Sequence, residues 1–160
     1  MKSAIVYFSA TGVTKKLAEC LAQLTSSELL EIVPKDLYSK EDLDWRNKES
    51  RSSIEMADRS SRPELASSSP IEKLEQYELI FLGFPIWWGV APTIVNTFLE
   101  QNDLENKKIA LFATSEESGM GETKEALEES LPHMHCLGEK RFGQEFSKEE
   151  IAEWVNSLDL

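Results

Sequence analysis

Short apolar runs alternate along the chain with longer stretches in which apolar residues recur every three or four positions. Uninterrupted runs are typical of strands covered on both faces, and the longer spacing is typical of helices that bury one face. Alternation of the two patterns predicts an α/β domain, a parallel sheet with helices packed against it. The clearest strands are SAIVYF (3–8), YELIFLGFP (77–85) and KKIALFAT (107–114), and the clearest helices are 13–25, 92–102, 122–131 and 147–158.

Two weaker strands complete the pattern. ELLEIVP (28–34) ends at Pro34, which cannot donate a ladder hydrogen bond and therefore belongs at an edge or an end of the sheet. We interpret HMHCLG (133–138) as a short last strand. The pattern predicts a three-layer, doubly wound, five-stranded parallel sheet in a single domain, 1–160. Ligands of such folds bind beyond the carboxyl ends of the strands, which makes the loops after strands one, three and four the candidates.

Residues 35–69 interrupt the alternation. This stretch is rich in Ser, Arg, Asp and Glu, and its apolar residues are scattered. We interpret it as an elaborated connection that contains short helices. Its apolar anchors are Leu37, Leu43, Trp45, Ile54 and Met56.

The chain is strongly acidic. Its 17 Lys and Arg residues stand against 29 Asp and Glu residues, which gives a formal net charge of -12. Such a charge repels nucleic-acid phosphates and anionic lipid headgroups, so we expect neither nucleic acid nor a membrane as a partner. The first residues pass directly into polar turn chemistry, and no later segment approaches about eighteen apolar residues. These features favour a cytoplasmic protein.

The residues that could bind a metal or carry hydrolysis are few. Cys20 and Cys136 lie far apart and lack the spacing of zinc ligands. The two histidines, His133 and His135, fall on the predicted last strand, where alternation puts Cys136 on the opposite face. No G-x-S-x-G elbow is present. We therefore predict no metal site and no catalytic acid, base or nucleophile.

SATGVT (9–14) joins the first strand to the first helix and is the first candidate ligand loop. Backbone N–H groups at a helix start point outward at its positive end, and Ser9, Thr11 and Thr14 add hydroxyl donors, a set that suits a phosphate. Gly12 allows close approach of a ligand to the backbone. The pattern is neither a P-loop nor a three-glycine dinucleotide turn, which disfavours a nucleoside triphosphate or NAD. An ordinary capped turn is the alternative.

The pattern S-x-T-G-x-T after the first strand resembles the phosphate loop of the flavodoxin family, which binds flavin mononucleotide (FMN). GFPIWWGVAP (83–92) follows the third strand, where that family places a loop against the isoalloxazine ring. TSEESG (114–119) follows the fourth strand, where a third loop contacts ring and ribityl atoms. The resemblance extends to DLDW (42–45) and SRPEL (61–65) in the connection. It implies the strand order 2-1-3-4-5 and a branch with a long insertion between strands two and three.

The resemblance implies FMN contacts from all three loops. Packing of an aromatic side chain on a flavin ring stabilises the complex by roughly 1 kcal/mol beyond the contribution of the buried area. Packing of the two adjacent tryptophans over the sheet edge is the alternative, and which of them meets the ring is open. The implied contact residues are Ser9, Ala10, Thr11, Gly12, Val13 and Thr14, then Pro85, Ile86, Trp87, Trp88 and Gly89, then Thr114, Ser115, Glu116, Glu117, Ser118 and Gly119.

Glu116 and Glu117 depart from the family pattern, which commonly has glycines at these positions. Carboxylates near the ring oppose negative charge on it and would move the last reduction to lower potential. A solvated loop without that influence is the alternative.

Three functions are consistent with these observations. The leading hypothesis is an FMN-binding electron carrier whose acidic surface docks on basic patches of redox partner proteins. The second is an FMN-dependent NAD(P)H reductase that acts on quinones or other small acceptors. The third is a flavin-free interaction module, because a fold does not by itself fix a function.

Overall fold

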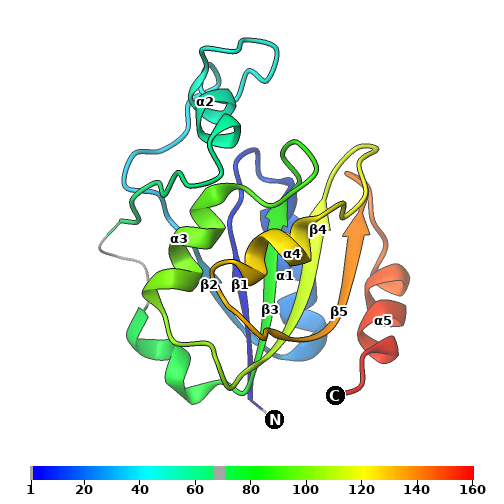
Figure 1. Cartoon of the computed structure of the whole chain (residues 1–160). Coiled ribbons are helices and arrows are strands. Elements are labelled where there is room, and N and C mark those ends of the chain that lie inside the picture. Colours follow the sequence, from blue (N-terminus) through cyan, green and yellow to red (C-terminus); the bar gives the residue numbers. More distant parts are fainter. Residues whose placement is uncertain (1, 67–70) are drawn as a thin grey trace.

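The computed structural model describes residues 2–66 and 71–160. All neighbouring strands of its sheet are parallel, in the order β2-β1-β3-β4-β5 (Figure 1). The predicted fold class and the strand order that the resemblance implied are both confirmed. The strands are β1 (Ser3–Tyr7), β2 (Glu28–Glu31), β3 (Leu79–Pro85), β4 (Lys108–Thr114) and β5 (His135–Phe142).

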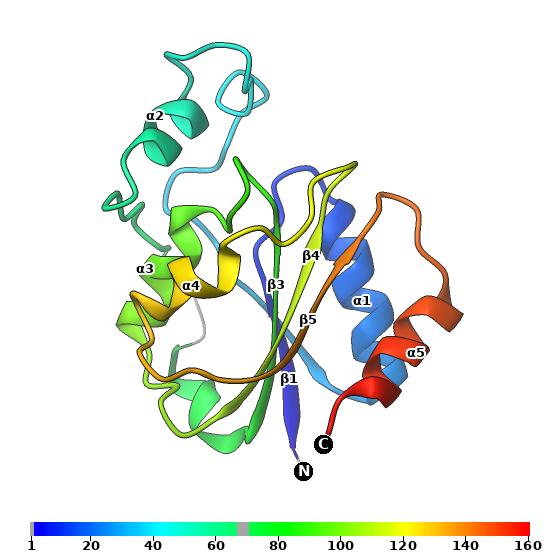
Figure 2. The ribbon, with the colours of Figure 1, turned by 45° about the vertical axis from the view of Figure 1, so that its right-hand side comes forward.

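Helices cover both faces of the sheet (Figure 2). One face carries α1 (Val13–Thr25) and α5 (Lys148–Ser157), and the other carries α3 (Thr93–Gln101) and α4 (Thr123–Glu128). A further helix, α2 (Arg51–Ala57), lies in the connection after β2, and the 3-10 helix η1 (Ile71–Gln76) precedes β3. Among residues 2–66 and 71–160, no helix is long and apolar enough to cross a bilayer.

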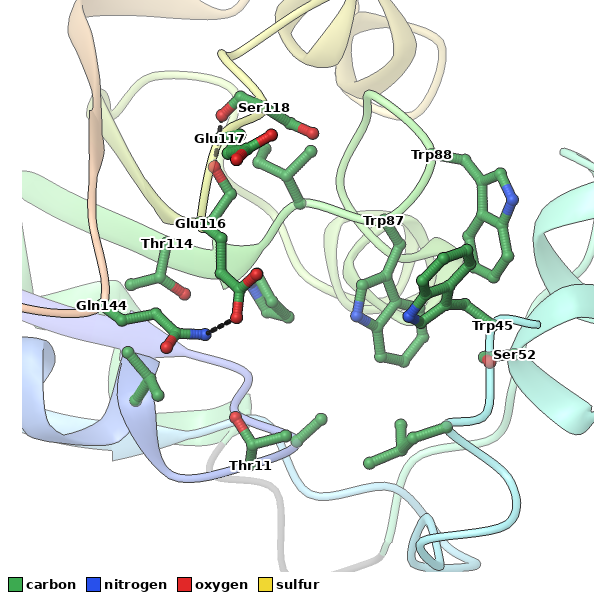
Figure 3. A pocket seen from close by; sticks show the side chains of 16 residues that line it. Thr11, Trp45, Ser52, Trp87, Trp88, Thr114, Glu116, Glu117, Ser118 and Gln144 are labelled. Atoms are coloured by element: carbon green, nitrogen blue, oxygen red, sulfur yellow. Dashed lines mark hydrogen bonds between the residues drawn. The ribbon is translucent and has the colours of Figure 1, made fainter.

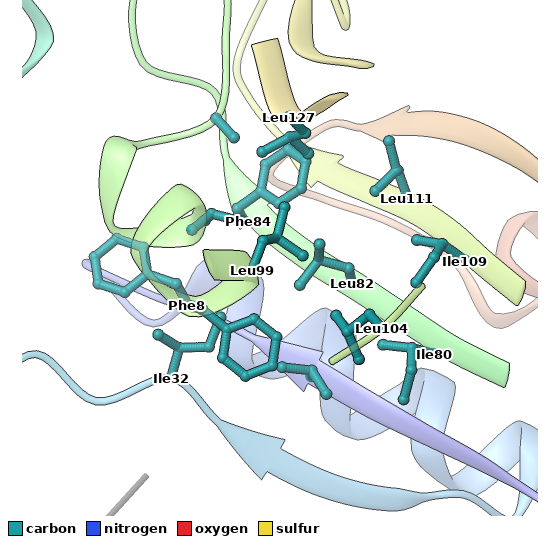
Figure 4. Close-up of a cluster of buried hydrophobic side chains, with 14 of the residues drawn as sticks. Phe8, Ile32, Ile80, Leu82, Phe84, Leu99, Leu104, Ile109, Leu111 and Leu127 are labelled. Carbon is teal, nitrogen blue, oxygen red and sulfur yellow. The ribbon is translucent and has the colours of Figure 1, made fainter. Parts of the chain in front are cut away.

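Alternation along the strands divides the core into two layers. On β3, Ile80, Leu82 and Phe84 face α3 and α4, whereas Leu79 and Phe81 face α1 and α5. Both sets are almost fully buried, which explains why the strand reads as continuously apolar. Figure 4 shows the layer beneath α3 and α4.

The last strand lies further along the chain than the sequence predicted. We expected 133–138, but β5 begins at His135 and continues to Phe142. It is an edge strand, paired with β4 alone within the described part of the chain, so polar and charged residues are tolerated along it. The apolar pattern therefore ends before the strand does. The opposite holds for the second strand. We expected 28–34, but β2 ends at Glu31, and Pro34 forms an isolated bridge with Leu65.

The connecting segment, residues 35–66, stands over the carboxyl ends of the strands (Figure 1). Tyr38 fixes it there, because its ring meets the rings of Phe8 and Trp87 edge-to-face at centroid distances of 5.7 and 5.5 Å. Phe8 and Trp87 complete the triangle at 5.8 Å. This aromatic triangle joins the end of β1, the connecting segment and the loop after β3 into one packed unit.

Candidate functional site

A cavity of about 580 Å³ lies at the carboxyl edge of the sheet (Figure 3). Its walls come from the loops after β1, β3 and β4, from the connecting segment, and from the residues after β5. This is the edge at which doubly wound folds bind ligands. The volume is within the usual range of small-molecule sites.

The loop after β1 presents the positive end of α1. Ser9 Oγ accepts hydrogen bonds from the N–H groups of Gly12, at 3.1 Å, and Lys15, at 3.2 Å, which hold the loop in its curve. Gly12 is the N-cap with φ 97°, a left-handed conformation that glycine adopts without strain, and Ser9 supplies the side-chain oxygen that Gly12 cannot. Of this loop, Ala10, Thr11 and Val13 line the cavity, and Ser9, Gly12 and Thr14 do not.

We expected the Thr14 hydroxyl to face a ligand, but it faces the interior of the protein. Its side chain is buried, and its Oγ1 lies 2.8 Å from Thr114 Oγ1 at the end of β4. The hydrogen bond ties the first loop to the third. Thr14 therefore positions the site from within the protein, because its helical position turns the side chain toward the sheet.

The loop after β3 is a tight hairpin turn. Trp87 and Val90 exchange backbone hydrogen bonds of 2.8 and 3.2 Å, and both residues between them have positive φ, 51° at Trp88 and 80° at Gly89. This is the type I′ arrangement of two-residue hairpin loops. Pro85, Ile86, Trp87 and Trp88 line the cavity, and Gly89 does not.

The two tryptophans of this turn have different surroundings. Trp87 is partly buried in the aromatic triangle and also lines the cavity. Trp88 is 51% exposed, and no ring of the described residues packs on it. Trp88 therefore offers more free aromatic surface to a ligand than Trp87 does.

The loop after β4 is held by a cation from β5. Arg141 donates to the carbonyl oxygens of Glu116, at 2.9 Å, and Ser118, at 3.1 Å, and to Ser115 Oγ at 3.1 Å. Ser115 Oγ also donates to the carbonyl of Ser118. The hydrogen bonds of Arg141 therefore fix the conformation of this loop, whereas glycine-rich turns reach theirs through the backbone freedom of glycine. Its cavity-lining residues are Thr114, Ser115, Glu116, Glu117 and Ser118, and Gly119 lies outside the cavity.

The carboxylates of this loop are not isolated charges. Gln144 Nε2 donates to Glu116 Oε1 at 3.0 Å, and the Arg141 guanidinium lies against the same loop. Gln144 lines the cavity. Arg141 thus places one positive charge beside a loop that carries two carboxylates.

Four cavity residues were missed by the sequence analysis. Leu43, Trp45 and Ser52 come from the connecting segment, and Gln144 follows β5. Trp45 could have been identified as a site residue, because it is a tryptophan in an otherwise polar stretch. Its side chain is 66% exposed. Nothing local in the sequence distinguishes Ser52 from the serines around it.

Within the connecting segment, polar contacts also join Tyr38 to α2. Its hydroxyl donates to Glu55 Oε1, and the Arg51 guanidinium lies 3.8 Å from the ring centroid. Burial, and then the bond to Glu55, raise the pKa of Tyr38 above its ordinary value. The tyrosine therefore keeps its proton as a donor throughout the physiological pH range.

The arrangement suits a ligand that is anionic at one end and flat at the other. The free N–H groups at the start of α1 and the Thr11 hydroxyl favour a phosphate. The indoles of Trp45, Trp87 and Trp88 supply flat apolar surface on the opposite side of the cavity (Figure 3). The charged side chains among the described lining residues are the carboxylates of Glu116 and Glu117.

Comparison with known proteins gives consistent matches. A family model described as flavodoxin matches residues 2–158. A protein from Bacteroides eggerthii, provisionally classed as a flavoprotein, is 36% identical with a TM-score of 0.91, over 99% of this chain and 98% of that one. One from Bacteroides uniformis, classed in the same way, is 38% identical with a TM-score of 0.91, over 97% of each chain.

A more distant match includes a bound cofactor. A flavoprotein from Lactobacillus acidophilus, solved in complex with FMN, is 25% identical with a TM-score of 0.69, over 96% of this chain and 98% of that one. No curated protein matches the chain at a significant level.

Proposed function

Because the chain belongs to the flavodoxin family, we propose that it binds FMN in the cavity at the carboxyl edge of the sheet and transfers electrons. The observation that carries this proposal is the convergence of the loops after β1, β3 and β4 on one cavity. The FMN complex of the Lactobacillus acidophilus flavoprotein supports the choice of cofactor.

The loop after β1 would hold the phosphate. Its curve is fixed by Ser9, which accepts from the N–H groups of Gly12 and Lys15, and the other N–H groups at the start of α1 would be the donors to the phosphate. A phosphate there would meet both hydrogen-bond donors and the positive end of a helix thirteen residues long. The cavity wall formed by Trp87 and Trp88 would receive the isoalloxazine ring.

FMN supplies the redox chemistry when it is bound, and the chain supplies binding, orientation and electrostatic tuning. Glu116 and Glu117 oppose negative charge on the ring, and Arg141 moderates their effect. The net charge of -12 favours docking on basic surfaces of redox partner proteins.

The test is a visible absorption spectrum of the purified protein before and after FMN addition and desalting, with tryptophan fluorescence followed in parallel. Retained flavin absorbance and quenched tryptophan emission are expected. A protein that stays colourless after reconstitution, with unchanged emission, would overturn the proposal and favour a flavin-free module.

A second candidate is an FMN-dependent NAD(P)H reductase of quinones or other small acceptors. It is favoured by the exposed indoles of Trp45 and Trp88, which offer flat surface to a small planar substrate. Steady-state oxidation of NADH or NADPH with a soluble quinone separates the two candidates. A carrier shows almost no turnover without a protein partner, whereas a reductase turns over repeatedly.

A further inference from the structure

Gly121, in the segment between β4 and α4, lies against the hairpin turn after β3. A Cβ placed on it would lie 3.5 Å from the Gly89 Cα, 3.2 Å from the Gly89 carbonyl carbon and closer still to the carbonyl oxygen. Because the oxygen is the nearest of the three atoms, the Gly89 carbonyl points at Gly121. Real Cβ atoms do not come so close to a backbone oxygen, so any side chain at position 121 would displace the turn.

The backbone at this contact is special on both sides. Gly121 has φ 54° and Gly89 has φ 80°, and in this left-handed region a residue with a side chain is strained. Gly121 does not line the cavity, so the approach of a ligand does not explain why glycine stands there. The close approach of the turn does explain it.

The segment that carries Gly121 is fixed at both ends. On one side, Arg141 donates to carbonyl oxygens within residues 116–118. On the other side, Thr123 is fully buried at the start of α4, and its N–H donates to the Met120 carbonyl at 3.0 Å. Gly121 is therefore held at a defined place, against which the turn can rest.

The turn in question carries Trp88, whose indole lines the cavity (Figure 3). Trp88 has φ 51°, and a residue other than glycine keeps such a conformation only where its surroundings enforce it. The contact between Gly89 and Gly121 comes directly after Trp88 in the turn. It supplies a constraint of the required kind.

We propose that Gly121 is a positioning residue for the flavin ring: its contact with the Gly89 carbonyl places the Trp88 indole where it packs on the isoalloxazine ring of FMN. This inference rests on the proposed function. Gly121 itself touches no ligand, and its effect on binding is transmitted by the indole of Trp88.

The first test is Gly121→Ala, with Gly143→Ala as the matched control. Gly143 also lies outside the cavity lining, and a Cβ there would have the Glu145 carbonyl oxygen at an ordinary 3.6 Å. Gly121→Ala should raise the Kd of FMN roughly two- to tenfold, the size of one aromatic contact. It should raise the Kd of riboflavin by the same factor, because the loop that holds the phosphate is not displaced. Gly143→Ala should change neither Kd, and a loss confined to FMN in Gly121→Ala would overturn the inference.

A double variant decides whether the effect depends on the indole. In the Trp88→Ala background, Gly121→Ala should add little further loss of FMN affinity, because the side chain that Gly121 positions is gone. Two losses that combine in full would assign Gly121 a structural role alone and overturn the inference.

Gly121→Asn separates displacement of the turn from backbone strain. Asparagine adopts the left-handed region more readily than alanine but carries the same Cβ. Gly121→Asn should therefore have a higher urea midpoint than Gly121→Ala and yet bind FMN as weakly. Recovery of the unmodified Kd in Gly121→Asn would show that strain, and not the position of the turn, is responsible.

Absence of FMN binding to the unmodified protein would instead overturn the proposed function. The apoprotein still tests the contact without a flavin, because Gly121→Ala should change its tryptophan emission, and should change it far less in the Trp88→Ala background. Emission that Gly121→Ala leaves unchanged would overturn the inference alone.

Discussion

Trp88 has a backbone conformation that its side chain disfavours. Its φ of 51° lies in the left-handed region, which costs an L-residue about 1–2 kcal/mol unless it is glycine or asparagine. Type I′ turns ordinarily place Asn-Gly at these two positions, and here the pair is Trp88-Gly89. Strain of this kind is found at functional sites, where the surrounding structure enforces it. The turn holds the indole at the cavity at the expense of stability.

Comparing Trp88→Asn with Trp88→Ala distinguishes the effect of the turn conformation on stability from the effect of the indole on FMN binding. Both variants lose the indole, so both should bind FMN more weakly by a similar factor. Trp88→Asn should be more stable than Trp88→Ala by roughly 1 kcal/mol, because asparagine adopts the left-handed region more readily. Urea unfolding of the two apoproteins measures the difference, and equal midpoints would contradict the account of strain.

At the scale of single residues, the sequence predicted which loops form the cavity better than it predicted where their side chains point. Hydroxyls, glycine and tryptophans identified three segments that meet at one cavity. The inward turn of Thr14 was not predictable, because its partner Thr114 is a hundred residues away. The burial of the Ser52 hydroxyl without a hydrogen-bond partner was not predictable either, because burial is a property of the folded chain.

On the strands, Gly83 and Phe112 form a matched pair. They are directly opposite in β3 and β4, and a Cβ placed on Gly83 would lie 2.1 Å from Phe112 Cζ. The phenyl ring therefore occupies the space that a side chain at 83 would need. Trp154 of α5 closes the layer, with its ring 6.4 Å from that of Phe112.

Gly83→Ala should destabilise the protein by roughly 1–3 kcal/mol, because the buried Phe112 ring must move within a packed layer. The free energy of unfolding from urea titration gives the value. Adding Phe112→Leu to Gly83→Ala should cost less than the sum of the two single changes, since each relieves the constraint on the other. Simple additivity would show that the ring does not depend on the glycine.

Glu100 of α3 connects three elements. It accepts a hydrogen bond from Ser130 at 2.6 Å, beyond the end of α4, and pairs with Arg62 of the connecting segment at 2.9 Å. The hydroxyl of Ser130 first, and Arg62 in addition, hold the pKa of Glu100 below its ordinary value of 4.5. The charged carboxylate is therefore favoured in the folded state.

A depressed carboxyl pKa contributes stability above the ordinary value and loses it as the pH falls through the folded value. Glu100→Gln should accordingly be less stable than the unmodified protein near neutral pH, and the gap should narrow as the pH falls below the ordinary value of 4.5. The contribution is small, because the pair is partly open to solvent. Urea midpoints of both proteins across the acid range measure the gap. A constant gap would exclude the carboxyl charge as its source.

Element types followed from the sequence more reliably than element ends. Buried strands such as β3 and β4 carry long apolar runs, so their positions were predictable. The edge strand β5 carries Glu139, Lys140 and Arg141, and only pairing with β4 identifies these residues as strand. The place of the connecting segment depends on long-range ring contacts, which no local pattern encodes.

At the scale of the whole molecule, the cavity depends on nearly the full chain. Its lining begins at Ala10 and ends at Gln144. A ligand that binds only this assembled state stabilises the entire fold, by about 2.7 kcal/mol at a free concentration one hundred times its Kd.

FMN at that concentration should raise the Tm by roughly 5–10 °C, given the entropy of unfolding of a domain of this size. Differential scanning fluorimetry or calorimetry with and without FMN measures the shift. Riboflavin at the same concentration should give a smaller one, because it leaves the loop after β1 without a phosphate. No shift at saturating FMN would mean that the ligand does not require the folded site.

A cavity assembled from both ends of the chain also affects how long the protein survives in a cell. Proteases act on opened molecules, and a bound flavin lowers the fraction of molecules that are open. Cells starved of riboflavin would accumulate the flavin-free form and clear it faster. The amount of this protein would then follow the vitamin supply even while its messenger RNA level stays constant.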